Sequence, residues 1–470
     1  MTCPIIILFN ENLSQKLNLN SIWLKSQQGL DYFTGRSKHY SPQPIAMVYA
    51  GHQFGSWVPQ LGDGRAILLG EILDKQKIRW DIQVKGSGQT PFSRSGDGRA
   101  ALGPVLREYL ISEAMYSLGI PSTRSLSAIM TGEQVIREKI LKGALITRVA
   151  KSHIRIGTFQ YFASRGDVEA IKQLSDYVIN RSYPEIFDKK FPYLELLKKV
   201  IDLQAKLIAQ WMSVSFIHGV MNTDNVSIVG ETIDYGPCAF MNQYDPKTVF
   251  SSIDTFKRYS YGNQPLICHW NLSQLASSLL PIISSNTEKS LKLAQFEIDK
   301  FSKIFDAYWI NFFGKKIGIK STKTSDKVLI QELLGIMEKD KLDFTLTFSS
   351  LKEFVSGQKF LDSKSKSQSI AHVSNSKNIS NWLTKWKKRL LIESSSLKDK
   401  QTLLSASNPS IIPRNHLVEE AINYALENNM DKFNLLLKHL RKPYNNNSAI
   451  KIFKSLPEKN DDNFQTFCGT

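Results

Sequence analysis

Two short stretches of the chain carry side chains suited to chemistry on phosphate groups. Residues 218–225 read His-Gly-Val-Met-Asn-Thr-Asp-Asn, and residues 234–236 read Asp-Tyr-Gly. Asn225 and Asp234 supply an amide oxygen and a carboxylate, which are hard ligands for Mg²⁺ or Mn²⁺ and leave coordination positions for substrate phosphates. We therefore predict a metal-dependent nucleotide site around these two residues.

The spacing of these residues is that of a protein kinase catalytic loop that lacks the base at its usual position. A kinase loop reads H-R-D-L-x-x-x-N, in which the Asp is the base and the Asn binds metal, and a later D-F-G supplies a second metal ligand. His218 and Asn225 keep this spacing, but the base position holds Val220, which cannot accept a proton. Asp224 is then the candidate base by elimination, and a carboxylate that caps its own loop is an equal alternative.

Lys85 and Glu108 form a second kinase-like pair in the sequence. Lys85 ends an expected strand, and Glu108 lies in the helix that follows. In kinases such a Lys contacts the nucleotide phosphates and is oriented by such a Glu. A surface Lys and a helix-face Glu are the commoner case, so it is the combination with Asn225 and Asp234 that favours the functional interpretation.

Glycine-rich turns and two arginines add candidate phosphate contacts. Residues 62–65 and 96–99 both read Gly-Asp-Gly-Arg, and glycines let backbone amides approach phosphate oxygens without a Cβ in the way. A tight turn that needs positive φ explains each motif as well, and Asp97 is a candidate acceptor for a nucleobase or ribose. Arg148 and Arg155 suit bidentate phosphate binding, at about 1.5–3 kcal/mol for each charge-assisted hydrogen bond, with structural salt bridges as the alternative.

The elements that must position these residues begin with strands. Alternating and β-branched residues predict strands over 66–72 and 80–85. Gly103 and Pro104 then open a predicted helix over 105–118, which Gly119 and Pro121 end. The order of strand, glycine-rich turn, strand with a terminal Lys, and helix is that of a kinase N-lobe.

The pattern after residue 162 is helical. We expect helices at 167–180, 193–214, 270–280, 289–313, 325–339, 379–388 and 417–440. The expected fold class is α+β, a protein-kinase-like two-lobe fold. Its parts are a β-rich N-lobe over 1–150, a mostly α-helical C-lobe over 151–350, and a helical C-terminal extension over 351–470. Residues 363–380 are polar and low in complexity, which predicts a surface loop.

Composition favours a globular, cytoplasmic protein. Hydrophobic residues make up 42% of the chain and charged residues 22%, which is ordinary for a globular protein. No apolar run approaches the roughly 20 residues of a membrane span, and the start lacks the pattern of a signal peptide. The net charge of +17 comes from dispersed basic residues without a nucleic-acid-binding signature, so we expect no nucleic-acid partner and no membrane partner. Attraction to acidic partners is the minority alternative.

Four cysteines occur without zinc-ligand spacing, which predicts free thiols in a reducing compartment: Cys3, Cys238, Cys268 and Cys468. Cys468 lies third from the end of the chain, where we expect it to be exposed and open to redox chemistry.

Taken together, these residues resemble the selenoprotein O / YdiU family of pseudokinase-fold protein nucleotidyltransferases. The resemblance extends over nearly the whole chain from residue 5. Its motifs are long: 49–55 (Tyr-Ala-Gly-His-Gln-Phe-Gly), 60–65 (Gln-Leu-Gly-Asp-Gly-Arg), 96–99, 218–225, 234–237 (Asp-Tyr-Gly-Pro) and 413–415 (Pro-Arg-Asn). Family members can link the terminal cysteine to another near the active site, but residues 244–254 contain no cysteine, so Cys468 has only Cys238 or Cys268 as doubtful partners.

The resemblance implies adenylyl transfer, in which AMP from ATP is placed on Ser, Thr or Tyr hydroxyls of protein substrates and pyrophosphate is released. ATP would bind flipped relative to a kinase, with Mg²⁺ or Mn²⁺, and some relatives transfer UMP from UTP. The implied metal ligands are Asn225 and Asp234, the implied proton acceptor is Asp224, and Glu108 would orient Lys85. The implied nucleotide-binding residues are Gly62, Gly64, Arg65, Lys85, Asp97, Gly98, Arg148, Arg155 and Asp234.

Two alternatives from the residues stay open. The first is a kinase that transfers the γ-phosphate with Asp224 as a displaced base. The second is a catalytically inactive pseudokinase scaffold, against which the retained metal ligands argue, because a scaffold does not need them.

Overall fold

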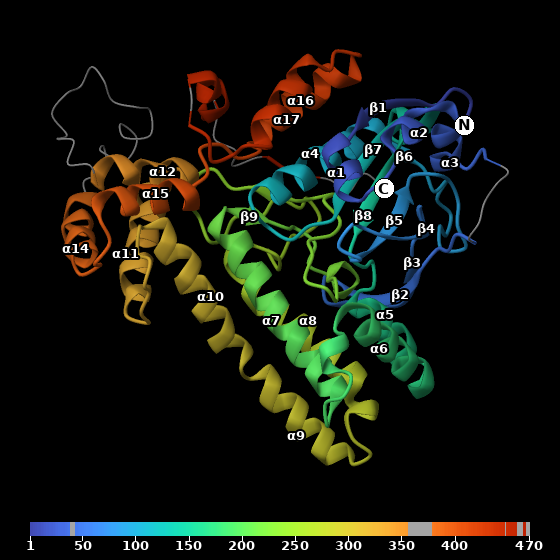
Figure 1. Ribbon diagram of the computed structural model, residues 1–470, viewed down its shortest axis with the longest axis horizontal. Coiled ribbons are helices and arrows are strands. Elements are labelled where there is room, and N and C mark those ends of the chain that lie inside the picture. Colours follow the sequence, from blue (N-terminus) through green and yellow to red (C-terminus); the bar gives the residue numbers. More distant parts are fainter. Residues whose placement is uncertain (38–42, 356–377, 447, 458–463, 467–470) are drawn as a thin grey trace.

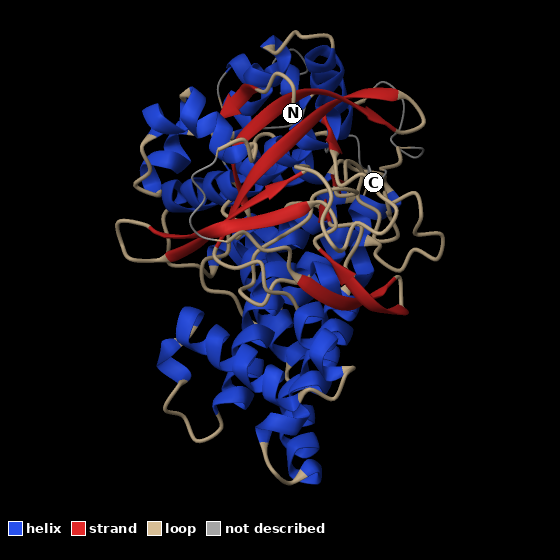
Figure 2. Ribbon diagram, turned by 90° about the vertical axis from the view of Figure 1, so that its right-hand side faces the viewer, coloured by secondary structure: helices blue, strands red, loops and turns tan. Residues whose placement is uncertain are grey.

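The structure is a computed structural model that describes residues 1–37, 43–355, 378–446, 448–457 and 464–466 of the chain. Over these residues it is a mixed α/β protein with one main β-sheet and many helices (Figures 1 and 2). In Figure 1 the main sheet lies at the right, and the long helices α7, α8, α9 and α10 extend below it.

The main sheet has six strands, and every pairing in it is antiparallel. The strand order is β1-β7-β8-β5-β4, with the short β6 paired to β8. The strands are β1 (Ile5–Phe9), β4 (Ala66–Leu73), β5 (Arg79–Lys85), β6 (Ala100–Ala101), β7 (Arg124–Ile136) and β8 (Ile140–Ala150). The strands predicted at 66–72 and 80–85 are thus confirmed, and they lie side by side as β4 and β5.

Both faces of this sheet are covered, and the alternation of side chains along β8 shows how. Leu145 and Val149 belong to a core shared with the N-terminal helices α1 (Glu11–Lys16), α2 (Ser21–Lys25) and α3 (Gln27–Phe33). Ala144 and Ile146 point to the other face and join the large core that contains α4 (Leu102–Ser117). Because successive side chains of a strand point to opposite faces, one strand serves both layers.

Helix α4 is the predicted helix over 105–118, extended by three residues at its start. Pro104 sits in its first turn, where the missing backbone N–H costs no helical hydrogen bond. The helix packs against β7 and β8, and the C-terminal helices α16 and α17 pack against it in turn. Glu108 is therefore held between the sheet and the C-terminal part of the chain.

Two small sheets and a 3₁₀ turn stand beside the main sheet. The hairpin of β2 (Val48–Gln53) and β3 (Ser56–Gly62) contacts the 3₁₀ turn η2 (Thr223–Asn225). Strands β9 (Phe216–Ile217) and β10 (Ala239–Phe240) pair on either side of the two chemical motifs. The pairing of β9 with β10 brings the ends of residues 218–237 together.

The rest of the described chain is mostly helical. The remaining helices are α5 (Ile156–Ala163), α6 (Val168–Ser182), α7 (Pro192–Ser213), α8 (Gln264–Ile283), α9 (Thr287–Ile298), α10 (Phe301–Lys316), α11 (Asp326–Lys339), α12 (Phe344–Val355), α14 (Ile379–Leu391), α15 (Leu397–Ser407), α16 (Asn415–Leu426) and α17 (Asp431–Leu440), with 3₁₀ turns at Pro184–Ile186, Tyr261–Asn263 and Ser448–Lys454. Helices predicted at 167–180, 193–214, 270–280, 325–339 and 379–388 are confirmed, and the third begins six residues earlier than expected.

Two long predicted helices are wrong as single elements. The helix expected over 289–313 is divided into α9 and α10. The Asp299 N–H still bonds to the Gln295 carbonyl four residues back, but the Lys300 N–H bonds to the Glu297 carbonyl three residues back, and the helical ladder is interrupted there. The helix expected over 417–440 is divided into α16 and α17, since Asn428 adopts a left-handed conformation with φ of 66°. Asn tolerates this conformation better than most residues, so it ends a helix without glycine.

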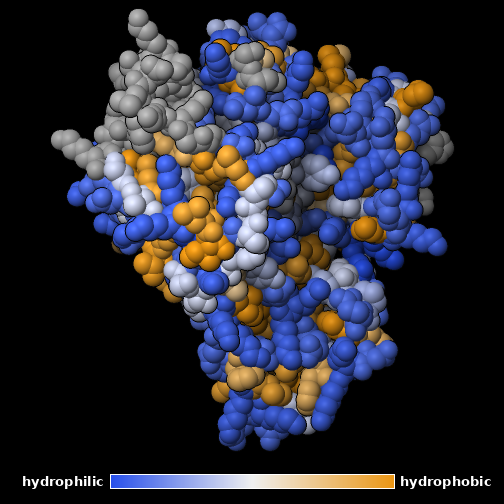
Figure 3. Space-filling model, turned by 60° about the vertical axis from the view of Figure 1, so that its left-hand side comes forward, coloured by the Kyte–Doolittle hydropathy of each residue, from blue (hydrophilic) through white to orange (hydrophobic). Residues whose placement is uncertain are grey.

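Part of the predicted polar loop and Cys468 lie outside the described residues. Of the loop expected over 363–380, only residues 378–380 are described, and Ile379 and Ser380 are the first residues of α14 rather than loop. Among the described residues one helix, Tyr261–Ile283, is long and apolar enough for a membrane span, but half of its apolar window is buried in the protein core. The face seen in Figure 3 is mostly hydrophilic, with smaller hydrophobic groups between.

Candidate nucleotide-binding cleft

A single cleft brings together almost all of the predicted site residues. It has a volume of about 490 Å³, within the range of small-molecule sites. The residues that line it include Gly62, Gly64, Arg65, Lys85, Asp97, Gly98, Arg148, Arg155, Asp224, Asn225 and Asp234. Glu108 is the one predicted residue that does not line the cleft, and it lies behind Lys85.

Lys85, Glu108 and Arg148 form a largely buried ion cluster in the wall of the cleft. Lys85 Nζ donates to Glu108 Oε2 at 3.0 Å, and Arg148 Nη2 donates to the same oxygen at 2.9 Å. Arg148 Nε donates to Glu108 Oε1. Burial alone would raise the pKa of Glu108, but Arg148 and Lys85 lower it to about 2, so the carboxylate is ionised at neutral pH. The cluster ties β5, β8 and α4 together and holds Lys85 in place.

The carboxylate of Asp234 also lies beside the charged groups of Lys85 and Arg148. Its Oδ1 lies 3.3 Å from Lys85 Nζ and 3.5 Å from Arg148 Nη2. Burial would raise the pKa of Asp234, but Lys85, Arg148 and Arg65 hold it well below its usual range. The residue has a φ of 63°, an unusual backbone conformation for a non-glycine residue, and its side chain keeps 28% exposure. An ionised carboxylate is thus presented to the cleft.

Asn225 and Asp234 are suited to share a cation with a nucleotide. Asn225 Nδ2 donates to the Val220 carbonyl at 3.1 Å, which orients the amide and leaves its oxygen as the free acceptor. No cluster of three or more His, Cys, Asp or Glu side chains suited to a metal occurs in the part of the chain that the structure describes. An amide oxygen and a carboxylate are ligands of the type that Mg²⁺ takes when phosphates and water complete its coordination.

Asp224 differs from Asp234 in its surroundings. Its side chain is 6% exposed; Oδ2 accepts from Gln53 Nε2 at 3.4 Å, and Oδ1 is buried without a hydrogen-bond partner among the described residues. Burial raises the pKa of Asp224 to about 6, against the opposing effects of its own backbone amide, Arg155 and Gln53. A carboxylate with a free oxygen and a pKa near neutrality is suited to accept a proton.

Arg155 lies beneath Asp224 and connects it to the glycine-rich turn. Its Nη1 donates to the Asp224 carbonyl at 3.3 Å, and its Nη2 lies 3.6 Å from Asp63 Oδ1. The guanidinium also stacks over the ring of Tyr49 at 4.4 Å. These contacts position Arg155 from three sides, while its side chain still lines the cleft.

Packing explains the glycines of the two turns. A Cβ on Gly62 would lie 2.3 Å from the Phe92 ring, and one on Gly98 would lie 2.0 Å from the Gly88 carbonyl oxygen.

Asp97 is bound by Arg137, whose two terminal nitrogens donate to its carboxylate at 2.9 Å each, and this arginine lowers the pKa of Asp97. Asp97 therefore reaches the cleft as part of an ion pair.

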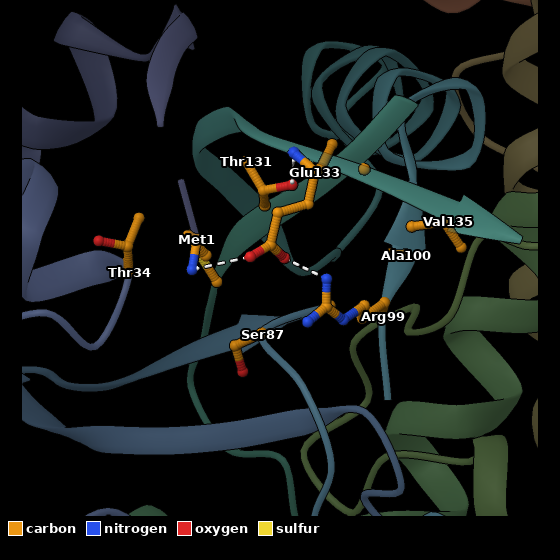
Figure 4. Close-up of a pocket in the computed structure, with 11 residues that line it drawn as sticks. Met1, Thr34, Ser87, Arg99, Ala100, Thr131, Glu133 and Val135 are labelled. Atoms are coloured by element: carbon orange, nitrogen blue, oxygen red, sulfur yellow. Dashed lines mark hydrogen bonds and ion pairs between the residues drawn. The ribbon is translucent and has the colours of Figure 1, made fainter. Parts of the chain in front are cut away.

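A second cavity lies beside the second turn and is too small for a nucleotide. Its volume is about 120 Å³, and Figure 4 shows Glu133 pointing toward Arg99 and the amino group of Met1 in it. Glu133 forms ion pairs with both groups, at 2.9 Å to Met1. Arg99 is thus neutralised by Glu133, whereas Arg65, from the equivalent position of the first turn, lowers the pKa of Asp234 across the cleft.

His218 has the surroundings of a structural anchor. Its ring stacks on Trp211 at 5.2 Å, Nε2 donates to the Ile233 carbonyl at 2.8 Å, and Nδ1 accepts from Val220 N at 3.3 Å. Burial lowers the pKa of His218, which keeps the ring neutral. It links the two chemical motifs without facing the cleft.

Sequence reasoning missed the residues of the β2–β3 hairpin that hold the loop around Asp224. His52 N donates to Thr223 Oγ1 at 2.8 Å, Gln53 bonds to Asp224, and a Cβ on Gly51 would lie 2.6 Å from Asp224 Oδ1. The only signal for them was their place in the long motif over 49–55, because Gly, His and Gln at this spacing indicate no chemistry by themselves.

The sequence is similar to known proteins along its whole length. A family model described as "Protein adenylyltransferase SelO" matches residues 1–441. Relatives named protein nucleotidyltransferase YdiU from Rhodopseudomonas palustris (strain BisB5), Bradyrhizobium diazoefficiens and Rhizobium rhizogenes are 48%, 49% and 49% identical. Each alignment covers 100% of this chain and 95%, 95% and 93% of the respective relative. The chain therefore belongs to the SelO family of protein adenylyltransferases and is a nucleotidyltransferase.

Proposed function

We propose that this protein transfers AMP from ATP to Ser, Thr or Tyr hydroxyls of protein substrates and releases pyrophosphate. The observation that carries the proposal is the separation of charges in the cleft. Lys85, Arg148 and Arg155 supply positive charge for phosphates, while Asp224, with a pKa of about 6, lines the same cleft and is the candidate acceptor of the hydroxyl proton. UMP transfer from UTP is the variant that the cleft does not exclude.

The reaction follows from these roles. Asp224 takes the proton of the acceptor hydroxyl, whose oxygen attacks the α-phosphorus. The bond from that phosphorus to the oxygen that bridges to the β-phosphate breaks, and pyrophosphate leaves with the electron pair. Lys85, Arg148 and Arg155 stabilise the charge that develops on pyrophosphate, the largest electrostatic demand of the step. Glu108 is a positioning residue, because it acts through Lys85 and Arg148.

The cation would be held by Asn225 and Asp234. Bound there, Mg²⁺ or Mn²⁺ supplies neutralisation of the phosphate charge. Gly62, Gly64, Arg65, Asp97 and Gly98 form the rest of the nucleotide-binding wall in this proposal, since all of them line the same cleft.

We also propose that the architecture is a kinase-like two-lobe fold. The main sheet with α4 would form the N-lobe over residues 1–150. Helices α5 to α11 and the first part of α12 would form the C-lobe over 151–350, and the remainder of the chain an extension over 351–470. The Lys85–Glu108 pair between β5 and α4 supports this arrangement. We propose a cytoplasmic protein that modifies other proteins and has neither nucleic acid nor membrane as partner.

The Lys85–Glu108 pair also favours a second candidate, a kinase that transfers the γ-phosphate with Asp224 as base. One experiment separates the two, and also the inactive scaffold. The protein is incubated with Mg²⁺ or Mn²⁺, a protein mixture and ATP labelled at either the α- or the γ-phosphate, followed by mass analysis. Label from α alone with the added mass of AMP supports the proposal. Label from γ alone identifies a kinase, and ATP binding without label in protein identifies a scaffold.

A further inference from the structure

The loop that follows the metal motif exposes two large apolar side chains three residues apart, the first of them at the cleft. Phe256 is 95% exposed and Ile253 is 62% exposed, and Ile253 also lines the cleft. Isolated exposed apolar residues are common, but a fully exposed Phe next to a site that acts on proteins is a candidate contact.

This loop is rigidly built, so the exposure of Phe256 is part of its fold. The carboxylate of Asp254 is 5% exposed and accepts hydrogen bonds from the backbone N–H groups of Arg258 at 2.8 Å and Tyr259 at 2.7 Å. The loop thus closes around Asp254 and directs Phe256 outward. A loop backbone held in this way loses little further freedom when a partner covers Phe256.

The same loop is bonded to the residues beside Asp224. Tyr259 donates from its hydroxyl to Asn222 Oδ1 at 2.6 Å, and Phe54 N donates to the same oxygen at 3.0 Å. The rings of Phe54 and Tyr259 lie 5.2 Å apart. Asn222 stands two residues before Asp224, so the exposed loop, the β2–β3 hairpin and the candidate base share one rigid junction.

Positive charge and a further aromatic side chain flank the two apolar residues. Lys257 is exposed, Arg258 stacks on Trp270 at 4.9 Å, and neither forms an ion pair with a carboxylate among the described residues. Trp57 of the β2–β3 hairpin is 39% exposed and packs on His52, whose ring lies 4.9 Å from that of Trp270. We name Trp57, Ile253, Phe256, Lys257 and Arg258 the rim surface.

We propose that the rim surface binds the segment of the acceptor protein around the modified hydroxyl, and that it selects segments with an apolar side chain and an acidic side chain near that hydroxyl. The inference rests on the proposed function. The apolar side chain would cover Phe256 and Ile253, and the acidic side chain would meet Lys257 and Arg258. In the proposed function the charged side chains of the cleft wall bind the nucleotide phosphates, so the rim surface is what remains to contact the acceptor protein.

The test uses the full chain, α-labelled ATP and synthetic peptide pools with a fixed Ser, Thr or Tyr and varied neighbouring positions. We expect the parent protein to prefer pools with Phe, Leu or Ile together with Asp or Glu. Phe256→Ala should lower kcat/KM for these pools by about 10-fold or more, while the Kd for ATP is unchanged. Phe296→Ala is the matched control, because Phe296 is 62% exposed on α9, away from the cleft, and should label all pools like the parent.

Lys257→Glu provides a second readout, since it should move the preference from acidic pools to pools with Lys or Arg. Equal labelling of all pools by the parent, or identical preferences in the Phe256→Ala, Lys257→Glu and Phe296→Ala variants, would overturn the inference and leave the proposed function standing. Absence of α-label on any peptide or protein with the parent would overturn both.

Discussion

Glu108 offers a sharp test of how the cleft is organised, through the isosteric change Glu108→Gln. Both carboxylate oxygens accept hydrogen bonds, Oε1 from Arg148 Nε and Oε2 from Arg148 Nη2 and Lys85 Nζ. A glutamine must place its NH₂ group against one of these donors. The orientation that loses fewer bonds keeps Lys85 and turns the NH₂ toward Arg148 Nε, which leaves two donors facing each other.

The size of the effect follows from the charges around Glu108. A pKa lowered from 4.5 to about 2 corresponds to about 3 kcal/mol of net preference for the ionised side chain in the fold. Removing one partner of a buried ion cluster costs about 3–5 kcal/mol, so we expect the free energy of unfolding to fall by about 3 kcal/mol. Losing one charge-assisted hydrogen bond that positions Arg148 and Lys85 costs about 1.5–3 kcal/mol. If that cost falls on the transition state, kcat/KM for transfer decreases by roughly 10- to 150-fold.

A matched control separates stability from activity. Glu113 lies on the same helix, is 2% exposed and accepts from Arg124 Nε and Nη2 at 2.6 and 2.7 Å, but it does not line the cleft. Glu113→Gln should lose a similar unfolding free energy in urea titrations and keep its transfer rate at temperatures where it is folded. If the two variants transferred AMP equally well, Glu108 would not orient Lys85 and Arg148, and the reasoning would be refuted.

Three further outcomes are expected. Asp234→Asn should abolish metal-dependent ATP binding in calorimetry, and asparagine tolerates the left-handed backbone at this position. Asp224→Asn should retain ATP binding and lower the rate of transfer by about 10²–10⁴-fold. Normal transfer by either variant would remove the role assigned to that residue. Gly51→Ala places a Cβ 2.6 Å from Asp224 Oδ1 and should lower kcat at unchanged Kd for ATP, and an unchanged kcat would show that the base is not held at this position. Burial raises the pKa of Glu231 from 4.5 to about 7, so the folded state holds a proton that the unfolded state releases, and the unfolding free energy should fall by about 3 kcal/mol as pH rises from 4.5 to 7. Glu231→Gln should show a fall smaller by this amount and be more stable than the parent protein at pH 8 in urea titrations.

The chemical groups of the cleft were predictable where their spacing along the chain is short. Asn225 and Asp234 stand nine residues apart, and Lys85 ends a strand 23 residues before Glu108 in the next helix, so local patterns were sufficient to select them. The strand and helix types were predictable for the same reason. The breaks at Asp299–Lys300 and Asn428 were not, because apolar periodicity continues through both points and only the backbone bonds of the folded chain interrupt the helices.

The surroundings that give Asp224 its properties are distant in sequence, and this limits what a motif can predict. Gln53, which bonds to Asp224, lies 171 residues before it. Gly157 packs against its backbone from α5, since a Cβ there would lie 3.2 Å from Asp224 Cα. None of these residue types indicates chemistry, yet together with Gly51 they exclude water from the carboxylate, and that burial raises its pKa to about 6. The same aspartate in an open loop would remain ionised near its usual pKa and would be a weaker proton acceptor. The sequence could therefore indicate which carboxylate is the candidate base, but only the packing of the β2–β3 hairpin and α5 against η2 gives a reason why that carboxylate is suited to the role.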